Sequence, residues 1–111
     1  MNDSLALSLA PDVARAARGD HAAFARVVDV TRNTVAAIAL AIVRDVELSH
    51  DVAQDVYLHA WRDLRRLREP TSFLPWLRQL ARNRAHHALR PMCAIVAAST
   101  AQATVSWRRP L

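Results

Sequence analysis

The chain has 111 residues, of which 52% are hydrophobic, and carries a formal net charge of +5. This length suits a single domain, and the apolar content is sufficient for one core. The single cysteine, Cys93, excludes an intramolecular disulfide and is typical of a reducing compartment. No basic segment precedes the first apolar run, and no apolar run is long enough to span a membrane. We therefore expect a soluble, cytoplasmic protein.

The charge is distributed unevenly along the chain. Residues 1–61 contain five arginines and eight acidic residues, whereas residues 62–90 contain eight arginines and two acidic residues. A cluster of arginines is typical of a surface that binds an anionic polymer such as nucleic acid, although many charged runs are only solvated faces. The acidic half of the chain remains available for a different contact.

The first half of the chain predicts two helices after a flexible N-terminus over residues 1–10. Pro11 suits the first turn of a short helix and Gly19 suits its end. Asp20 is a suitable N-cap for a long helix that reaches about Val43. Apolar side chains recur at helical spacing along this second helix and predict its buried stripe. The stripe consists of Phe24, Val27, Val28, Thr31, Val35, Ile38, Ala39 and Ile42.

A third helix is predicted after a turn at Arg44 and Asp45. Either Asp45 or Ser49 can cap this helix, which runs to about Leu67. Its apolar positions also recur at helical spacing and predict a buried seam. The seam consists of Leu48, Val52, Val56, Ala60, Leu64 and Leu67.

A fourth helix is predicted after a break at Pro70, because proline keeps the preceding residue out of helical geometry. Ser72 is its expected N-cap and Pro91 its expected end. Residues 91–111 show no clear period and are expected to form an atypical tail that is irregular or weakly helical. The chain is therefore predicted to be all-α, a compact bundle of about four helices over residues 11–90.

No set of residues indicates catalysis. A single glycine excludes the glycine-rich loops that hold phosphates, and the lone cysteine has no nearby histidine oriented to activate it. The five histidines lack the spacing of metal ligands on a helix. We expect no enzyme activity, no cofactor and no metal site.

Two surfaces are predicted instead. Asp51, Gln54 and Asp55 lie on one face of the third helix together with Leu58, next to Trp61. Acidic residues near a helix N-terminus are favoured by the helix dipole, but a polar rim around an apolar contact is typical of a protein-binding face. In the fourth helix, arginines surround Phe73 and Trp76, a combination that suits single-stranded nucleic acid, although a tryptophan at this position is often part of the core.

The chain also resembles a known family. The order D-x-x-Q-[DE]-x-[YF]-L-x-A-W, then L-x-x-[LF]-R, then S-F-x-x-W-L-x-x-[IL]-A-R-N, then L-R is similar to region 2 of the sigma-70 family of bacterial transcription initiation factors. The extracytoplasmic function (ECF) group is the closest match in pattern. These motifs correspond to residues 51–61, 64–68, 72–83 and 89–90, and residues 17–24 resemble the entry into region 2. The resemblance covers about residues 12–90.

The resemblance implies that the third helix binds core RNA polymerase, on the coiled coil of the largest subunit. The implied polymerase-binding residues are Asp51, Gln54, Asp55, Leu58 and Trp61. The loop and the fourth helix are implied to bind the non-template strand of the −10 promoter element and to hold it open. The implied DNA-binding residues are Arg68, Glu69, Pro70, Thr71, Ser72, Arg78, Arg82, Asn83, Arg84 and His86.

Nothing after Pro91 resembles region 4, the domain that reads the −35 element in this family. A region 2 fragment, a truncated gene and a variant that relies on another protein remain as alternatives. An alternative function is a degenerate or truncated sigma domain that only binds polymerase or an anti-sigma factor and does not support initiation.

Overall fold

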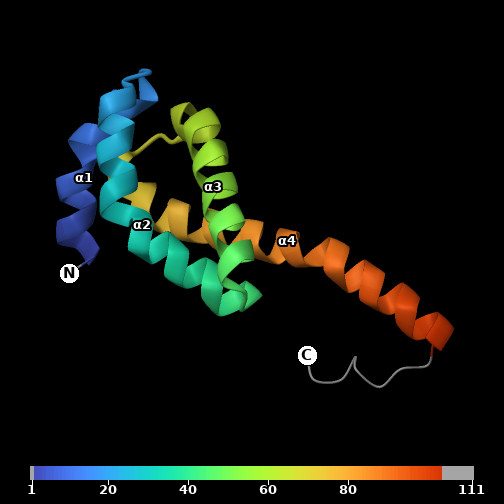
Figure 1. Ribbon diagram of the computed structural model, residues 1–111. Coiled ribbons are helices and arrows are strands. Elements are labelled where there is room, and N and C mark those ends of the chain that lie inside the picture. The colour runs from blue at the N-terminus through green and yellow to red at the C-terminus, as the bar shows by residue number, and fades with distance from the viewer. Residues whose placement is uncertain (1, 104–111) are drawn as a thin grey trace.

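The computed structural model describes residues 2–103, with side chains described for Leu5 and for residues 7–90. Four helices and two short 3₁₀ turns make up these residues, and no strand occurs among them. The fold is therefore all-α, as the sequence predicts. In chain order the elements are α1 (Asn2–Ala17), α2 (His21–Val43), α3 (Val46–Asp63), η1 (Leu64–Arg66), η2 (Pro70–Ser72) and α4 (Phe73–Ala103). Helices α1, α2 and α3 surround the first half of α4, and the second half of α4 extends away from them (Figure 1).

Helix α1 begins at Asn2, so the prediction of a flexible segment over residues 1–10 is wrong for the residues described. The reason is an apolar stripe at i, i+4 and i+8, because Leu9 and Val13 are buried and Leu5 packs against the core. Pro11 lies inside the helix with its ring exposed, where it costs one backbone hydrogen bond without entering the core. Burial of the leucines offsets that loss.

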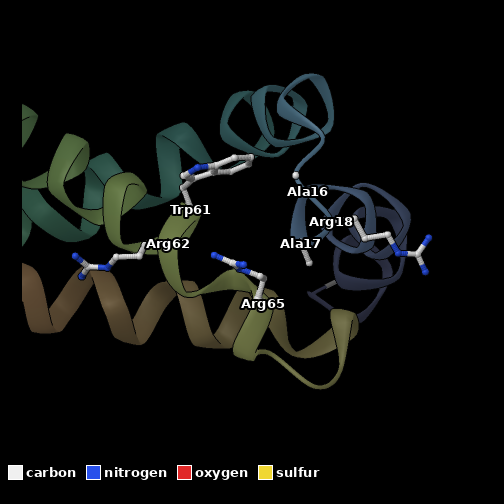
Figure 2. A pocket seen from close by; sticks show the side chains of 7 residues that line it. Ala16, Ala17, Arg18, Trp61, Arg62 and Arg65 are labelled. Atoms are coloured by element: carbon white, nitrogen blue, oxygen red, sulfur yellow. The ribbon is translucent and has the colours of Figure 1, made fainter.

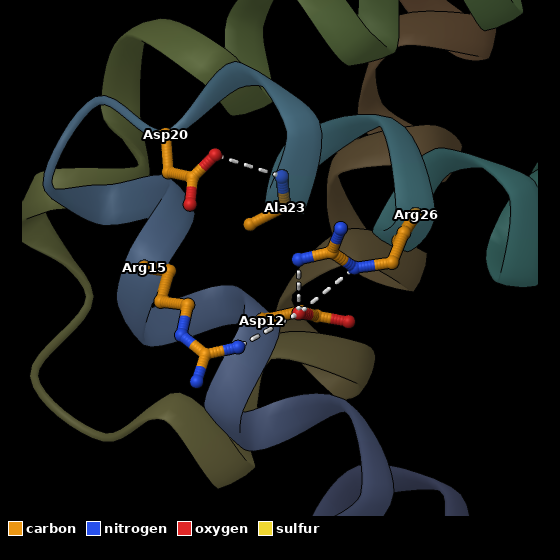
Figure 3. A network of polar contacts seen from close by, with 5 residues as sticks. All are labelled: Asp12, Arg15, Asp20, Ala23 and Arg26. Atoms are coloured by element: carbon orange, nitrogen blue, oxygen red, sulfur yellow. Dashed lines mark hydrogen bonds and ion pairs between the residues drawn. The ribbon is translucent and has the colours of Figure 1, made fainter.

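The turn between α1 and α2 has the predicted glycine and cap. Gly19 has a φ of +98°, a conformation that favours glycine, and its N–H donates to the Ala16 carbonyl. The Asp20 carboxylate then accepts a hydrogen bond from the Ala23 N–H at 3.1 Å and caps α2 (Figure 3). Asp20 is therefore the N-cap that the sequence predicts.

Asp12 joins α1 to α2 through arginine. Its Oδ1 atom accepts hydrogen bonds from Arg26 Nη2 at 3.0 Å and Nε at 3.2 Å, and Arg15 Nη1 lies 3.8 Å away (Figure 3). The hydrogen bond from Arg26 is the main cause that lowers the pKa of Asp12 below its ordinary value of 3.8, and the charges of Arg26 and Arg15 act in the same direction. The Asp12 charge therefore favours the folded chain.

This lowered pKa predicts a pH dependence of stability. A carboxyl group whose pKa falls on folding stabilises the protein above its unfolded pKa, and the effect is lost as the pH falls through the folded pKa. Asp12→Asn should therefore lower the free energy of unfolding at pH 6, and the difference from the unsubstituted chain should shrink below pH 3.8. Urea denaturation at pH 6 and pH 3 measures both differences. Equal differences at the two pH values would contradict this role.

The turn between α2 and α3 consists of Arg44 and Asp45. Arg44 adopts the left-handed conformation with a φ of 55°, and its N–H donates to the Leu40 carbonyl at 2.8 Å. The Asp45 carboxylate accepts from the Leu48 N–H at 3.0 Å, so Asp45 is the N-cap of α3, while Ser49 is buried and donates to the Val46 carbonyl. Asp45, the first of the two predicted residues, is therefore the cap.

The core follows the predicted stripes closely. Both long helices contribute buried residues at helical spacing, and so does the first half of α4. The buried residues of these three helices, with Leu64 of η1, are Ala23, Val27, Thr31, Val35, Ala39, Val43, Ser49, Val52, Val56, Ala60, Leu64, Phe73, Leu74, Leu77, Ala81 and Ala85. Phe73 is only 1% exposed, so its ring packs in the core and cannot stack on a base. Trp76 also packs against the core, with its ring 5.8 Å from that of Phe73.

The break before α4 is longer than predicted, because α3 ends at Asp63 and not at about Leu67. Pro70 begins the 3₁₀ turn η2, whose last residue, Ser72, donates its backbone N–H to the Glu69 carbonyl at 2.9 Å. Ser72 is therefore part of that turn, and α4 starts directly at Phe73. The predicted side-chain cap is absent among the hydrogen bonds described for this segment, because the 3₁₀ turn leads into the helix without an extended residue between them.

The C-terminal end of helix α4 also differs from the prediction, which placed it at Pro91. Its backbone continues through Pro91 to Ala103, so residues 91–103 follow the helical alternative for the tail. Proline removes one helix hydrogen bond but does not prevent the chain from continuing as a helix. The side chains of this segment, including Cys93, lie outside the described side chains, and residues 104–111 lie outside the described residues.

Candidate protein-docking and nucleic-acid-binding surfaces

The outer face of α3 carries the predicted protein-binding residues. Asp51 and Gln54 are exposed, and Leu58 is 70% exposed, the largest exposure among the large apolar side chains described. These residues follow at intervals of three and four, which places them on one side of the helix. An apolar side chain held in solvent between polar neighbours is typical of a docking face.

Trp61 is fixed on this face by aromatic side chains of α2. Its indole stacks on the His21 ring with centroids 4.6 Å apart, and it meets the Phe24 ring edge-on at 5.0 Å. Phe24 in turn meets Tyr57 of α3 edge-on at 6.4 Å. Such contacts favour one orientation of each ring. The four rings form a continuous wall between the N-terminal turn of α2 and the C-terminal half of α3.

The wall borders a shallow groove of about 460 Å³. Gln54 and Leu58 complete its lining with His21, Phe24, Tyr57 and Trp61. The sequence predicts Gln54, Leu58 and Trp61, but it does not predict His21, Phe24 or Tyr57 as part of a site. Phe24 belongs to the predicted core stripe, and only the packing of α2 on α3 places its ring at the surface edge of that stripe.

A hydrogen bond of its hydroxyl group holds Tyr57 in the wall. Its Oη atom lies 2.7 Å from Thr31 Oγ1, which also donates to the Val27 carbonyl at 2.8 Å, so the Tyr57 hydroxyl donates to Thr31. Burial raises the pKa of Tyr57 above its ordinary value of 10.0. The hydroxyl therefore remains neutral at physiological pH and fixes the tilt of the ring.

Asp55 lies at the edge of the docking face, and both of its carboxylate oxygens are engaged. Oδ2 accepts from the Nε atom of Arg84 on α4, and Oδ1 lies 3.2 Å from Nε2 of His59. Arg62 contacts the other ring nitrogen of His59, Nδ1. Since an arginine can only donate, this pattern fits the neutral tautomer of His59 with its hydrogen on Nε2. The network joins α3 to α4.

The arginines of α4 do not share one face. Arg82 and His86 are exposed and follow each other at i and i+4, and Asn83 is exposed beside them, where its side chain accepts from Gln79 at 3.0 Å. Arg84 follows Arg82 by two residues, which turns it by about 200° around the helix, toward α3. The sequence groups Arg84 with the DNA-binding residues, whereas the structure brings it to Asp55. Arg78 is half-buried.

The predicted base-binding loop lies between α3 and α4. Arg68, Glu69, Thr71 and Ser72 are exposed, and Pro70 is half-buried. The η2 turn packs against α1, so α1 supports this loop. Glu69 has extended backbone geometry directly before Pro70, as the proline requires.

A second hollow, of about 680 Å³, lies between the end of α1 and the end of α3. Figure 2 shows the Arg65 side chain pointing toward Trp61, while Arg18 and Arg62 point away on opposite sides. Trp61 lines both this hollow and the shallow groove beside the four aromatic rings. Arg62 of α3 and Arg65 of η1 are exposed beside this hollow, where the arginine-rich stretch of the sequence begins.

Two further kinds of site are absent from the described residues. No group of three or more histidine, cysteine or acidic side chains within this part of the chain could hold a metal ion. None of its helices combines the length and apolarity needed to cross a membrane.

The sigma-70 region 2 family model matches residues 27–91, more than half of the chain. The chain belongs to this family. The matched range contains both surfaces except the two α2 rings His21 and Phe24, which lie just before it. This sigma region 2 domain is also of the ECF type, as its relatives indicate.

Three relatives place this region 2 domain among sigma factors. It is 50% identical over 88 residues to the probable RNA polymerase sigma factor RfaY of Xanthomonas campestris pv. campestris, a match that covers 79% of this chain and 22% of RfaY. It is 34% identical over 77 residues to the ECF RNA polymerase sigma factor SigK of Mycobacterium tuberculosis, covering 68% of this chain and 41% of SigK. The RNA polymerase sigma-H factor of Pseudomonas aeruginosa is 32% identical over 77 residues, covering 69% and 40% of the two chains.

The region 2 domain therefore spans between about a fifth and two fifths of the curated relatives that it matches. No solved structure matches this chain at a significant level.

Proposed function

We propose that this chain acts in transcription initiation as a sigma region 2 domain. It binds the coiled coil of the largest subunit of core RNA polymerase through α3, and it binds the non-template strand of the −10 promoter element through the 68–72 loop and α4. The observation that supports this proposal best is the juxtaposition of an exposed Leu58 and an aromatic groove with a separate arginine-rich surface, within the residues that match the family.

The docking half of the proposal is supported by the chemistry of the groove. Leu58 and the ring of Trp61 supply apolar area, while Asp51 and Gln54 supply exposed acceptors and donors around it. A helix of the partner that presents apolar side chains flanked by arginines would complement this pattern. The aromatic wall is already ordered, so little side-chain entropy would be lost on binding.

The DNA half is supported by exposed donors on the loop and on one face of α4. Arg68, Arg82 and Asn83 are exposed, and so is His86. Guanidinium groups on the phosphates of an opened strand, together with capture of an unstacked base at the loop, would favour melted DNA over duplex. No bond is made or broken in this mechanism, so the chain needs no catalytic residue.

Substitution of Arg82 tests the DNA half. Arg82→Ala should weaken the binding of a −10 non-template oligonucleotide several-fold and reduce the slope of log K against log salt by about 0.7, because one phosphate contact is lost. Fluorescence anisotropy at several salt concentrations measures both quantities. Arg32→Ala is the matched control, because Arg32 is an exposed arginine of α2 that pairs only locally with Asp29. An unchanged slope for Arg82→Ala would argue against the proposed DNA face.

The alternative is a domain that binds polymerase or an anti-sigma factor and does not support initiation. The exposed Leu58 and the aromatic groove suit this alternative as well, because both need only a protein partner. Run-off transcription with core polymerase on a promoter with a pre-opened −10 region distinguishes the two. A domain that acts in initiation should increase transcript from the specific start, whereas an interaction module should bind polymerase without that increase.

A further inference from the structure

We propose that Arg84 of α4 is a positioning residue of the polymerase-docking surface and does not bind DNA. This inference rests on the proposed docking of α3 on polymerase, and it extends that surface to a second helix. The family resemblance implies that Arg84 binds DNA. Its contacts in the structure are instead with the docking face.

The first argument is the direction of the side chain. Arg84 points toward α3, and its side chain is only 24% exposed, whereas Arg82 and His86 lie in solvent on the other side of α4. A strand that follows Arg82 and His86 would therefore meet the face of α4 opposite to Arg84. The guanidinium would have to leave its carboxylate partner and cross the helix surface to reach such a strand.

The second argument is the state of Asp55. Arg84 holds Oδ2 and His59 holds Oδ1, so the carboxylate is fixed from two sides while 38% of the side chain remains exposed. A carboxylate can accept about four hydrogen bonds, so acceptor capacity remains for a partner. Arg84 thus presents an oriented acceptor at the edge of the groove, and this pre-organisation lowers the entropic cost of docking.

The third argument is charge. Asp55 and Arg84 together carry no net charge, because the carboxylate and the guanidinium form an ion pair. One turn earlier on the same face, Asp51 is exposed and has no ion pair among the described residues. Asp51 can therefore attract a cationic partner at a distance, whereas Asp55 provides a directed hydrogen bond at contact.

The test uses the full chain and measures its affinity for core RNA polymerase. Arg84→Ala should weaken this affinity about three- to ten-fold, because Asp55 loses its orientation. It should leave the oligonucleotide affinity and its salt slope unchanged within error. Arg32→Ala, which removes an exposed arginine and its ion pair from α2, should leave the polymerase affinity unchanged. Unaltered polymerase affinity of Arg84→Ala, or a shallower salt slope for DNA, would overturn the proposal.

A charge swap separates positioning from a purely structural role. In the double variant Asp55→Arg with Arg84→Asp, the ion pair between α3 and α4 can form again, so the midpoint of urea unfolding should recover. Polymerase affinity should stay reduced, because the docking face now presents a guanidinium in place of the carboxylate. Recovery of both quantities would show that Arg84 only fastens the two helices together, and would overturn the proposal.

If the swapped pair does not restore stability, a double-mutant cycle distinguishes the positioning role of Arg84 from a purely structural one. Arg84→Ala should weaken docking much less in the Asp55→Ala background than in the unsubstituted chain, because it acts through Asp55. An equal loss in both backgrounds would overturn the proposal. If Leu58→Asp also leaves polymerase affinity unchanged, the proposed docking function itself fails. If Leu58→Asp weakens polymerase binding and only the Arg84 variants leave the affinity unchanged, the docking function stands and this inference alone is wrong.

Discussion

Leu58→Asp should abolish measurable binding of this domain to core RNA polymerase at concentrations that saturate the unsubstituted chain. Leu58 lines the aromatic groove and exposes 70% of its surface, so it is the apolar side chain best placed to be buried by a partner. A carboxylate at the centre of an apolar contact would be desolvated without a counter-charge, and loss of a central anchor costs about 2–4 kcal/mol of binding free energy. Core polymerase from Xanthomonas campestris, the source of the 50% identical relative, is a suitable binding partner for biolayer interferometry.

The fold should survive this substitution, because Leu58 makes little contact with the core. Exposed substitutions usually change the free energy of unfolding by about 0.5 kcal/mol or less. Val30→Asp is the matched control, since Val30 is an exposed apolar residue of α2 outside the groove. Normal polymerase binding by Leu58→Asp, or an equal loss with Val30→Asp, would contradict the location of the docking surface.

Phe73→Ala should cause the largest loss of stability of any single substitution proposed for this chain. The Phe73 ring is 1% exposed and lies at the start of α4, where it packs with Trp76 against the bundle. Truncation of a buried phenylalanine removes its transfer free energy and leaves a cavity, at a cost of about 3–5 kcal/mol. Urea denaturation followed by circular dichroism at 222 nm should show a large fall in the midpoint.

A second variant separates the core role of Phe73 from the base-stacking role that its sequence position also suggests. Phe73→Leu keeps most of the apolar volume and should retain the fold with a smaller loss of stability. Its affinity for the −10 oligonucleotide should equal that of the unsubstituted chain, because the ring does not reach solvent. A selective loss of DNA affinity in a stable Phe73→Leu variant would place the ring in the DNA site.

Local features of this fold could be predicted from the sequence because they depend on residues a few positions apart. Asp20 and Asp45 cap their helices, Gly19 ends α1, and Arg44 and Asp45 form the turn. The apolar spacing also predicted which sides of α2 and α3 are buried. In each case the deciding hydrogen bond or periodicity lies within one helix or one turn.

The N-terminal part of α1 could not be predicted in the same way. Residues 2–10 come before Pro11, and because proline suits the first turn of a helix the sequence predicts that the helix begins only there. Leu9 is buried, and α1 packs against α2, η2 and α4. Tertiary burial therefore determines that helix, and the same packing places η2, at the end of the 68–72 loop, against α1.

The sequence by itself determined the family and the all-α fold and predicted two kinds of surface, because motif spacing, helical period and charge pattern are properties of the order of residues. Only the tertiary structure decided which side chains meet across helices. It joined Arg84 to Asp55, placed His21 and Phe24 against Trp61, and buried Phe73. These contacts depend on how α2, α3 and α4 are rotated and packed against one another, and residues far apart in the chain carry no local signal of that arrangement.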